Sequence, residues 1–136
     1  MMSKKEKEGI DVKSIVEAAA APAAIGPYSQ AIRYGDLLFV SGTLGMDPKT
    51  GEFAGAGIEA QAVQVLENLK AIVTASGMTL GNVLKSTVFL RDMNDFAKFN
   101  EIYARYFPAN PPARETVQVA RLPRDAAIEI SVICGA

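Results

Sequence analysis

Residues 110–135 read NPPARETVQVARLPRDAAIEISVICG and predict two β-strands joined by a short proline-containing turn at Leu122–Asp125. Arg114 stands at the head of the first strand, and Glu129 stands in the middle of the second among apolar residues. Two antiparallel strands joined by so short a turn are neighbours in a sheet or lie one strand apart. We therefore expect a guanidinium and a carboxylate to be displayed at one place on the sheet.

This pair of side chains suits the recognition of a small carboxylate and the activation of water. The rigid fork of arginine grips a planar carboxylate through two parallel charge-assisted hydrogen bonds. A carboxylate nearby is an acceptor for a proton from water. The alternative is a structural ion pair or a solvated pair at a sheet edge. Arg114 and Glu129 taken alone favour that alternative, because structural pairs have the same appearance.

Composition limits the classes of function that the chain can have. With 136 residues and a net charge of −1, it predicts one globular domain without the bulk charge that attracts nucleic acid. The absence of histidine excludes Ser-His-Asp and Cys-His catalysis and the commonest zinc sites, and we expect no metal site. The single cysteine, Cys134, ends an apolar strand and predicts a buried or edge thiol in a reducing compartment.

The first 20 residues predict a charged tail that forms a short helix or stays mobile, followed by one domain over residues 21–136. The acidic residues of the tail disfavour a secretory signal and a mitochondrial transit peptide. No run of apolar residues is long enough to span a membrane. We expect a soluble protein of the cytosol.

The rest of the chain predicts a mixed sheet with two helices. A hairpin is indicated at Ala31–Tyr34 and Leu37–Ser41 around Gly35-Asp36. Helical periodicity covers Ile58–Ser76 and Asp95–Phe107, with Asn94 as the expected N-cap of the second helix, and Lys85–Arg91 predicts a strand. Two helices on one face of the sheet leave the other face open. The strand predicted at Lys85–Arg91 has apolar residues on both of its faces. Apolar residues on the open face of the sheet predict self-association.

Three polar positions outside the C-terminal hairpin stand out. Tyr28 follows a Gly-Pro bend, Ser41-Gly42 ends a strand with two unshielded backbone amides, and Asn100 lies slightly off the aromatic stripe of the second helix. Each taken alone is an ordinary packed tyrosine, a strand end or a surface amide. The glycines at 51, 55 and 57 do not match a phosphate-binding fingerprint and predict a flexible lead into the first helix.

Four segments taken together resemble the RidA (YjgF) family: APAAIGPYSQAI, FVSGTLGMDPKTGE, STVFLRDMNDFAKFNEIY and PPARETVQVARLPRDAAIEI. They occur in the family's order and extend the resemblance from about Ala21 to Ile133. The resemblance implies a chorismate-mutase-like α/β fold and a homotrimer with sites between subunits. It also implies hydrolysis of enamines and imines such as 2-iminobutanoate and 2-iminopropanoate to 2-keto acids and ammonia, without a cofactor.

The resemblance also assigns roles to single residues. Arg114 is implied to bind the substrate carboxylate and Glu129 to activate water, while the remaining site positions fall on Tyr28, Ser41, Gly42 and Asn100. Two positions depart from the family pattern: Thr116 stands where many deaminases have cysteine, and Glu115 replaces a small residue. Strand alternation puts Thr116 on the face of Arg114, where it joins the candidate substrate-binding residues, and turns Glu115 away toward packing or subunit contacts.

Two other classes of function stay open at this point. Relatives have been described as endoribonucleases or translation inhibitors acting on single-stranded RNA, although the chain lacks histidine, a metal cluster and a basic stripe. A trimer that binds small carboxylates without turnover is the third hypothesis. We expect small-molecule ligands and other copies of this chain as partners, with no membrane and no nucleic acid.

Overall fold

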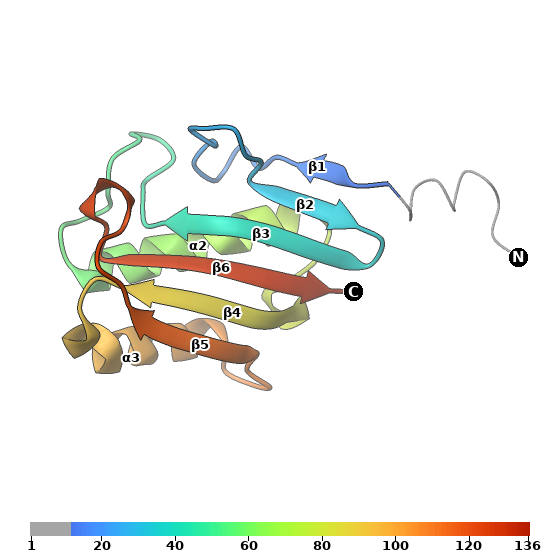
Figure 1. Cartoon of the computed structure of the whole chain (residues 1–136). Helices are drawn as coiled ribbons and strands as arrows, with labels where there is room; N and C mark the ends of the chain where they lie inside the picture. Colours follow the sequence, from blue (N-terminus) through green and yellow to red (C-terminus); the bar gives the residue numbers. More distant parts are fainter. Residues whose placement is uncertain (1–11) are drawn as a thin grey trace, which may run out of the picture.

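Residues 12–136 are described by a computed structural model, in which a six-stranded sheet carries two α-helices on one face (Figure 1). The strands are β1 (Ser14–Val16), β2 (Ala31–Tyr34), β3 (Leu37–Leu44), β4 (Val83–Leu90), β5 (Ala113–Gln118) and β6 (Ile128–Gly135). The α-helices are α2 (Ile58–Ala75) and α3 (Phe96–Tyr106), and short 3-10 helices lie at η1 (Leu80–Asn82), η2 (Met93–Asp95) and η3 (Pro123–Asp125). None of these helices combines the length and hydropathy needed to cross a membrane.

The sheet has the order β1-β2-β3-β6-β4-β5. Strand β5 pairs with β4 in parallel, and all other neighbouring strands are antiparallel. The two strands of the C-terminal segment, β5 and β6, are therefore antiparallel and separated by β4. Of the two arrangements predicted for them, the structure has the one with an intervening strand.

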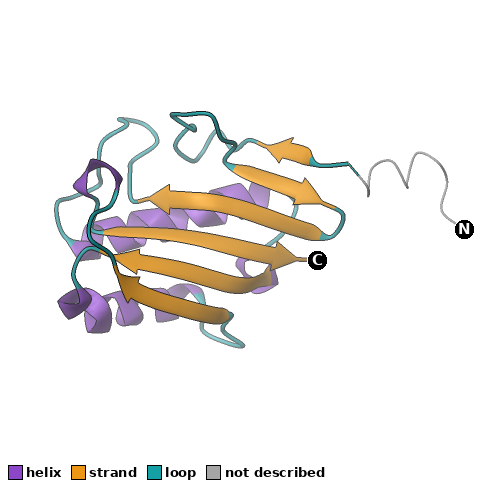
Figure 2. Ribbon diagram, viewed as in Figure 1, coloured by secondary structure: helices purple, strands orange, loops and turns teal. Residues whose placement is uncertain are grey.

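Both helices lie behind the sheet in Figure 2, so one face is covered and the other is open. The covered face contributes alternate residues of the central strands to the core, together with one stripe of each helix. Its largest fully buried side chains include Leu38, Leu66, Leu69, Ile72, Leu90, Phe99, Ile102, Ile128 and Ile130. The predicted mixed sheet with two helices on one face is confirmed, as is the buried Cys134 thiol.

The open face of the sheet carries apolar side chains that no element in residues 12–136 covers. Strand pairing places Leu37, Phe39 and Ile133 on this face, and Val117 joins them from the edge strand β5. Leu84 reaches the same face, because a side chain on Gly135 would contact both Leu84 and Leu37. We call these five residues the open-face patch.

Several predicted boundaries differ from the structure. Strand β3 runs on to Leu44, so Ser41 and Gly42 lie inside the strand and do not end it. Strand β1 lies inside the predicted N-terminal tail, because Ser14–Val16 extends the edge of β2 instead of forming a helix; residues 1–11 of that tail fall outside the described part. Helix α3 begins after η2, and the side chain that caps this segment is Asp92, which accepts from the Asn94 amide at 2.9 Å. Asn94 therefore supplies a backbone donor and is not the N-cap.

Candidate active site

Arg114 lies on the covered face of the sheet, at the edge strand β5. It pairs across the ladder with Ser86, which is fully buried under α3. The guanidinium lies over three aromatic rings of α3, with its Cζ 4.8 Å from the ring centroid of Tyr103, 5.1 Å from that of Phe99 and 5.7 Å from that of Phe96. Such contacts attract a cation to the ring faces and hold the guanidinium in place.

Asn100 completes this cluster from the same helix. Its side-chain oxygen accepts a hydrogen bond of 2.8 Å from Nη2 of Arg114. The other guanidinium donors have no hydrogen-bond partner in the described residues, and Arg114 is half-buried rather than sealed. An arginine oriented by one bond and an aromatic platform still has donors available for a planar anion. We call Arg114, Asn100 and the three rings the arginine cluster.

The aromatic platform is itself anchored to the sheet. The Tyr103 hydroxyl donates a buried hydrogen bond of 2.8 Å to Oγ of Ser86, and burial raises the pKa of Tyr103 above its ordinary value. The aromatic stripe of this helix was predicted from the sequence, but its role as a platform for Arg114 was not. The signal that indicates this role is an arginine on the strand that follows the stripe.

Thr116 and Glu115 point to opposite faces, as strand alternation predicts. Thr116 pairs with the fully buried Val88 on the covered face, and its hydroxyl is the one buried side-chain oxygen or nitrogen in residues 12–136 without a hydrogen-bond partner. Glu115 points to the open face, where it accepts from Lys85 at 2.9 Å. That exposed ion pair borders the open-face patch.

Glu129 lies on the open face, near the middle of the sheet. It pairs across the ladder with Phe89, three residues from the Ser86 that faces Arg114. Because side chains alternate along a strand, Ser86 and Phe89 point to opposite faces, and so do Arg114 and Glu129. The expectation that one chain displays both groups at one place on the sheet is therefore wrong.

A β-bulge shapes the surroundings of Glu129. The register of β3 against β6 shifts between Val40 and Thr43, so Ser41 and Gly42 together face a single residue of β6. A Cβ at position 42 would overlap the Glu129 carboxylate where it now lies, so Gly42 leaves the space that this carboxylate occupies. The carboxylate is half-buried and accepts no hydrogen bond from the described residues, and burial raises its pKa above the ordinary glutamate value.

Ser41 and Tyr28 line the same cavity as Gly42, on which the Glu129 carboxylate lies, but they differ in how much of their hydrogen-bonding capacity is used. The Ser41 hydroxyl donates to the backbone oxygen of Ser29 at 2.6 Å, so its proton holds the preceding segment in place. Tyr28 is exposed, and its hydroxyl accepts a long bond of 3.5 Å from the Ile25 amide, which leaves its own proton free. We call Glu129, Gly42, Ser41 and Tyr28 the glutamate cluster.

Metal chemistry gains no support from the described residues. No group of three or more histidine, cysteine, aspartate or glutamate side chains in residues 12–136 is arranged to hold a metal ion. Burial raises the pKa of the Cys134 thiol to about 11, which keeps it protonated and unreactive.

The sequence profile of the family described as "Endoribonuclease L-PSP" matches residues 18–135 of this chain. This chain belongs to that family, the RidA family. A RutC family protein of Saccharolobus solfataricus is 52% identical over 122 residues, which are 90% of this chain and 97% of that protein. The 2-iminobutanoate/2-iminopropanoate deaminase of Homo sapiens is 44% identical over 122 residues, covering 90% of this chain and 89% of that one.

A solved structure of the family has the same fold as this chain. The crystal structure of E. coli TdcF with bound serine has a TM-score of 0.87 and 46% sequence identity, and the match covers 90% of this chain and 98% of that chain. Relatives of the RidA family thus include imine deaminases and a protein with a small bound amino acid.

Proposed function

We propose that this protein hydrolyses 2-imino acids to 2-keto acids and ammonia, in a site formed between two copies of the chain. Imine deaminases among the relatives support the reaction class. The main support for a site between two copies is that Arg114 and Glu129 point to opposite faces of one sheet. The arginine cluster of one copy and the glutamate cluster of the next supply the two halves of this site.

The open-face patch supports a homotrimer as the assembly. A contact in which one surface of a copy meets a different surface of the next generates a closed ring when the rotation closes. Each contact of such a ring brings one arginine cluster to one glutamate cluster. Burial of the open-face patch stabilises the ring, because apolar area removed from water contributes roughly 25 cal/mol per Å². Sedimentation at micromolar concentration should show a trimer; a monomer would remove the shared site.

In the proposed mechanism, Arg114 grips the substrate carboxylate through the donors that Asn100 leaves free. Fixing that end places the imine carbon beside Glu129, aided by the backbone amides near Ser41 and Gly42. Glu129 takes a proton from water as the hydroxyl adds to the imine carbon, and it passes that proton to the imine nitrogen.

The resulting carbinolamine then loses ammonia. Its hydroxyl proton leaves as the carbon–oxygen double bond forms, the carbon–nitrogen bond breaks, and the nitrogen departs as ammonia after taking up a proton through Glu129. One imine and one water thus give one 2-keto acid and one ammonia. The raised pKa of Glu129 suits a general base, because a base works best when its pKa approaches the working pH. Tyr28 shapes the pocket and orders the water.

Binding without turnover is the second candidate, favoured by the serine bound to E. coli TdcF. It predicts that 2-keto acids bind while imine loss proceeds at the rate in buffer. Action on single-stranded RNA, suggested by the family description, is tested separately: cleavage that persists in an Arg114→Ala variant would assign it to another surface or to a contaminant.

A mixed-chain experiment tests the shared site. Arg114→Ala chains are inactive and Glu129→Gln chains nearly so in this proposal, but together they form sites that take Arg114 from one variant and Glu129 from the other. In a random one-to-one mixture about a quarter of the sites in a ring combine two intact residues. Iminobutanoate, generated from threonine by a dehydratase, reports the recovered activity.

The control is each variant unfolded and refolded alone, which should show no more than the residual activity of that variant. Recovery near a quarter of wild-type activity supports halves from different copies. Zero recovery from mixed trimers, with an active wild type, would contradict the shared site while leaving the reaction itself intact.

A further inference from the structure

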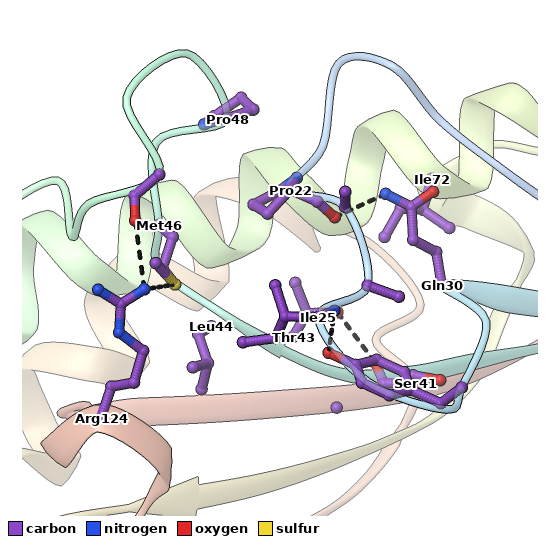
Figure 3. Close-up of a pocket in the computed structure, with 15 residues that line it drawn as sticks. Pro22, Ile25, Gln30, Ser41, Thr43, Leu44, Met46, Pro48, Ile72 and Arg124 are labelled. Atoms are coloured by element: carbon purple, nitrogen blue, oxygen red, sulfur yellow. Dashed lines mark hydrogen bonds between the residues drawn. The ribbon is translucent and has the colours of Figure 1, made fainter.

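A cavity of about 310 Å³ lies beside the glutamate cluster (Figure 3). It is bordered by the segment between β1 and β2, which we call the strap (residues 17–30), by the end of β3, by the loop that follows, and by α2. Most of its lining is apolar: Pro22, Ala24, Ile25, Leu44, Met46 and Ile72. A concave, largely apolar pocket with a few polar groups at one end is typical of a small-molecule site.

The strap is held in place by one buried side chain. The amide of Gln30, which is 8% exposed, accepts from the Ala18 amide at 2.6 Å and donates to backbone oxygens of the strap, at 2.6 Å for Pro22. Ser41 adds the 2.6 Å bond to Ser29 described above. These bonds fix both ends of the strap, so the cavity exists before any ligand arrives, and a ligand does not have to order its walls.

Arg124 lines the cavity at its far end. Its Nη1 donates to the backbone oxygen of Gly51 at 3.2 Å and contacts Sδ of Met46 at 3.5 Å, and its guanidinium lies 5.8 Å from the ring centroid of Phe53. Figure 3 shows Arg124 and Met46 at one end and Ser41 at the other, with Leu44, Thr43 and Ile25 between them.

The near end opens at the glutamate cluster, since Tyr28, Ser41 and Gly42 line the cavity. Gly42 is also the residue on which the Glu129 carboxylate lies. A carbon held for attack by water at Glu129 therefore has the mouth of the cavity next to it. On one side of that carbon the substrate carries its carboxylate; on the other it carries its side chain.

We propose that this cavity receives the substrate side chain and makes the protein favour 2-imino acids with branched apolar side chains over those with a methyl or ethyl group. The inference rests on the proposed function, because it assumes that the imine carbon lies at Glu129. The volume admits on the order of ten non-hydrogen atoms at ~30 Å³ each. An isobutyl group fits with room to spare, and each methylene buried there improves binding about fourfold.

The test compares two imines generated by an L-amino acid oxidase, one from alanine and one from leucine. The wild-type protein should show a kcat/KM on the leucine-derived imine that is at least about tenfold higher than on the alanine-derived imine. Ala24→Leu fills the cavity, and the ratio of the two values should fall about tenfold or more. Ala75→Leu makes the same change at an exposed position of α2 that does not line the cavity, and the ratio should stay at the wild-type value.

Ile25→Ala provides a second variant that does not depend on packing a larger side chain. Ile25 is 76% exposed, so its truncation costs little stability while it removes one apolar wall. The ratio should fall here too, by severalfold. Unchanged ratios in folded Ala24→Leu and Ile25→Ala, with an active wild type, would overturn the inference and leave the deaminase activity standing.

A binding measurement separates failure of the cavity from failure of the reaction. If the wild type accelerates loss of neither imine, the proposed function fails, and titration with 4-methyl-2-oxopentanoate and with pyruvate then tests the cavity directly. Tighter binding of the longer keto acid, lost in Ala24→Leu, supports the side-chain pocket. Equal binding of both keto acids, or no effect of Ala24→Leu, removes it.

Discussion

The arginine cluster and the glutamate cluster hold their charged groups in different ways. Arg114 sits on an edge strand of the covered face, supported by three rings and by the Asn100 amide. Glu129 sits on a central strand of the open face, beside a bulge, with no hydrogen-bond donor in the described residues. The first cluster leaves guanidinium donors free for an anion, and burial in the second raises the pKa of Glu129, which suits an anion clamp and a proton acceptor respectively.

Strand parity is the reason that the two clusters are apart. Arg114 and Glu129 pair with residues 86 and 89 of the same strand, β4. An odd separation along one strand puts the two side chains on opposite faces, whatever the length of the turn between β5 and β6. In the proposed function each cluster acts together with its counterpart from another copy, so substitutions in the two clusters should affect activity differently.

Substitution of Arg114 should have the largest effect. Arg114→Ala is expected to abolish imine hydrolysis, and Arg114→Lys to lose most of it, because lysine keeps the charge but lacks the two-point grip. Rates on threonine-derived imine measure this, with circular dichroism to check the fold. Full activity of Arg114→Lys would contradict two-point binding of the substrate carboxylate by Arg114.

Glu129→Gln should come next, with turnover reduced by roughly a hundredfold. Glutamine keeps the shape and accepts a hydrogen bond but cannot take a proton from water. A 2-keto acid should still bind through Arg114, as measured by titration. If Glu129 were only a structural group, the loss would appear in the melting temperature or the ligand affinity, with turnover of bound imine nearly normal.

The open-face patch should matter through assembly. Ile133→Lys places a charge in the proposed contact between copies and should weaken the trimer by about tenfold or more, since an unpaired charge is costly to bury. Val63→Lys is the matched control, because Val63 on α2 is 36% exposed and Ile133 is 37% exposed. Sedimentation measures the fraction of trimer in both variants. An equal fraction in Ile133→Lys and Val63→Lys would mean that the open face has no role in assembly.

The pH dependence should distinguish the clusters further. Burial raises the pKa of Glu129, so activity should fall as the pH drops through that raised value, and Glu129→Gln should lack this acid limb. Between the pKa of the unfolded chain and the raised pKa, the folded chain holds more protons. Stability contributed by this group is therefore present at low pH and declines as the pH rises through the window. Denaturant melts of both proteins at several pH values measure the difference.

The smallest effect on activity is expected from substitution of Ser86, which supports the arginine cluster from the sheet. Ser86→Ala removes the partner of the Tyr103 hydroxyl and should cost about 1–2 kcal/mol of folding stability, because that buried hydroxyl loses its hydrogen bond. Activity should decline only modestly, through a looser platform under Arg114. Urea unfolding checks the cost, and a loss of activity as large as that of Arg114→Ala would mean that the platform acts directly on the substrate.

Local patterns of the sequence determined much of this protein. The hairpin at Gly35-Asp36, the span of α2 up to Gly77 and the two strands of the C-terminal segment follow from periodicity, turn residues and φ preferences, which act between residues close in the chain. Membership of the RidA family was also visible in four separated motifs. The short strand β1 was not predictable in this way, because Ser14–Val16 has a partner only once β2 is in place.

Only the tertiary structure decided how the candidate site is divided. The insertion of β4 between β5 and β6, and the pairing of Arg114 and Glu129 with positions of opposite parity, depend on contacts distant in sequence. The same holds for Gln30, whose amide holds the strap over the cavity, and for the bulge that brings Gly42 under the Glu129 carboxylate. Sequence spacing specifies which groups a strand carries, while strand register, set by packing of the whole sheet, specifies which groups meet.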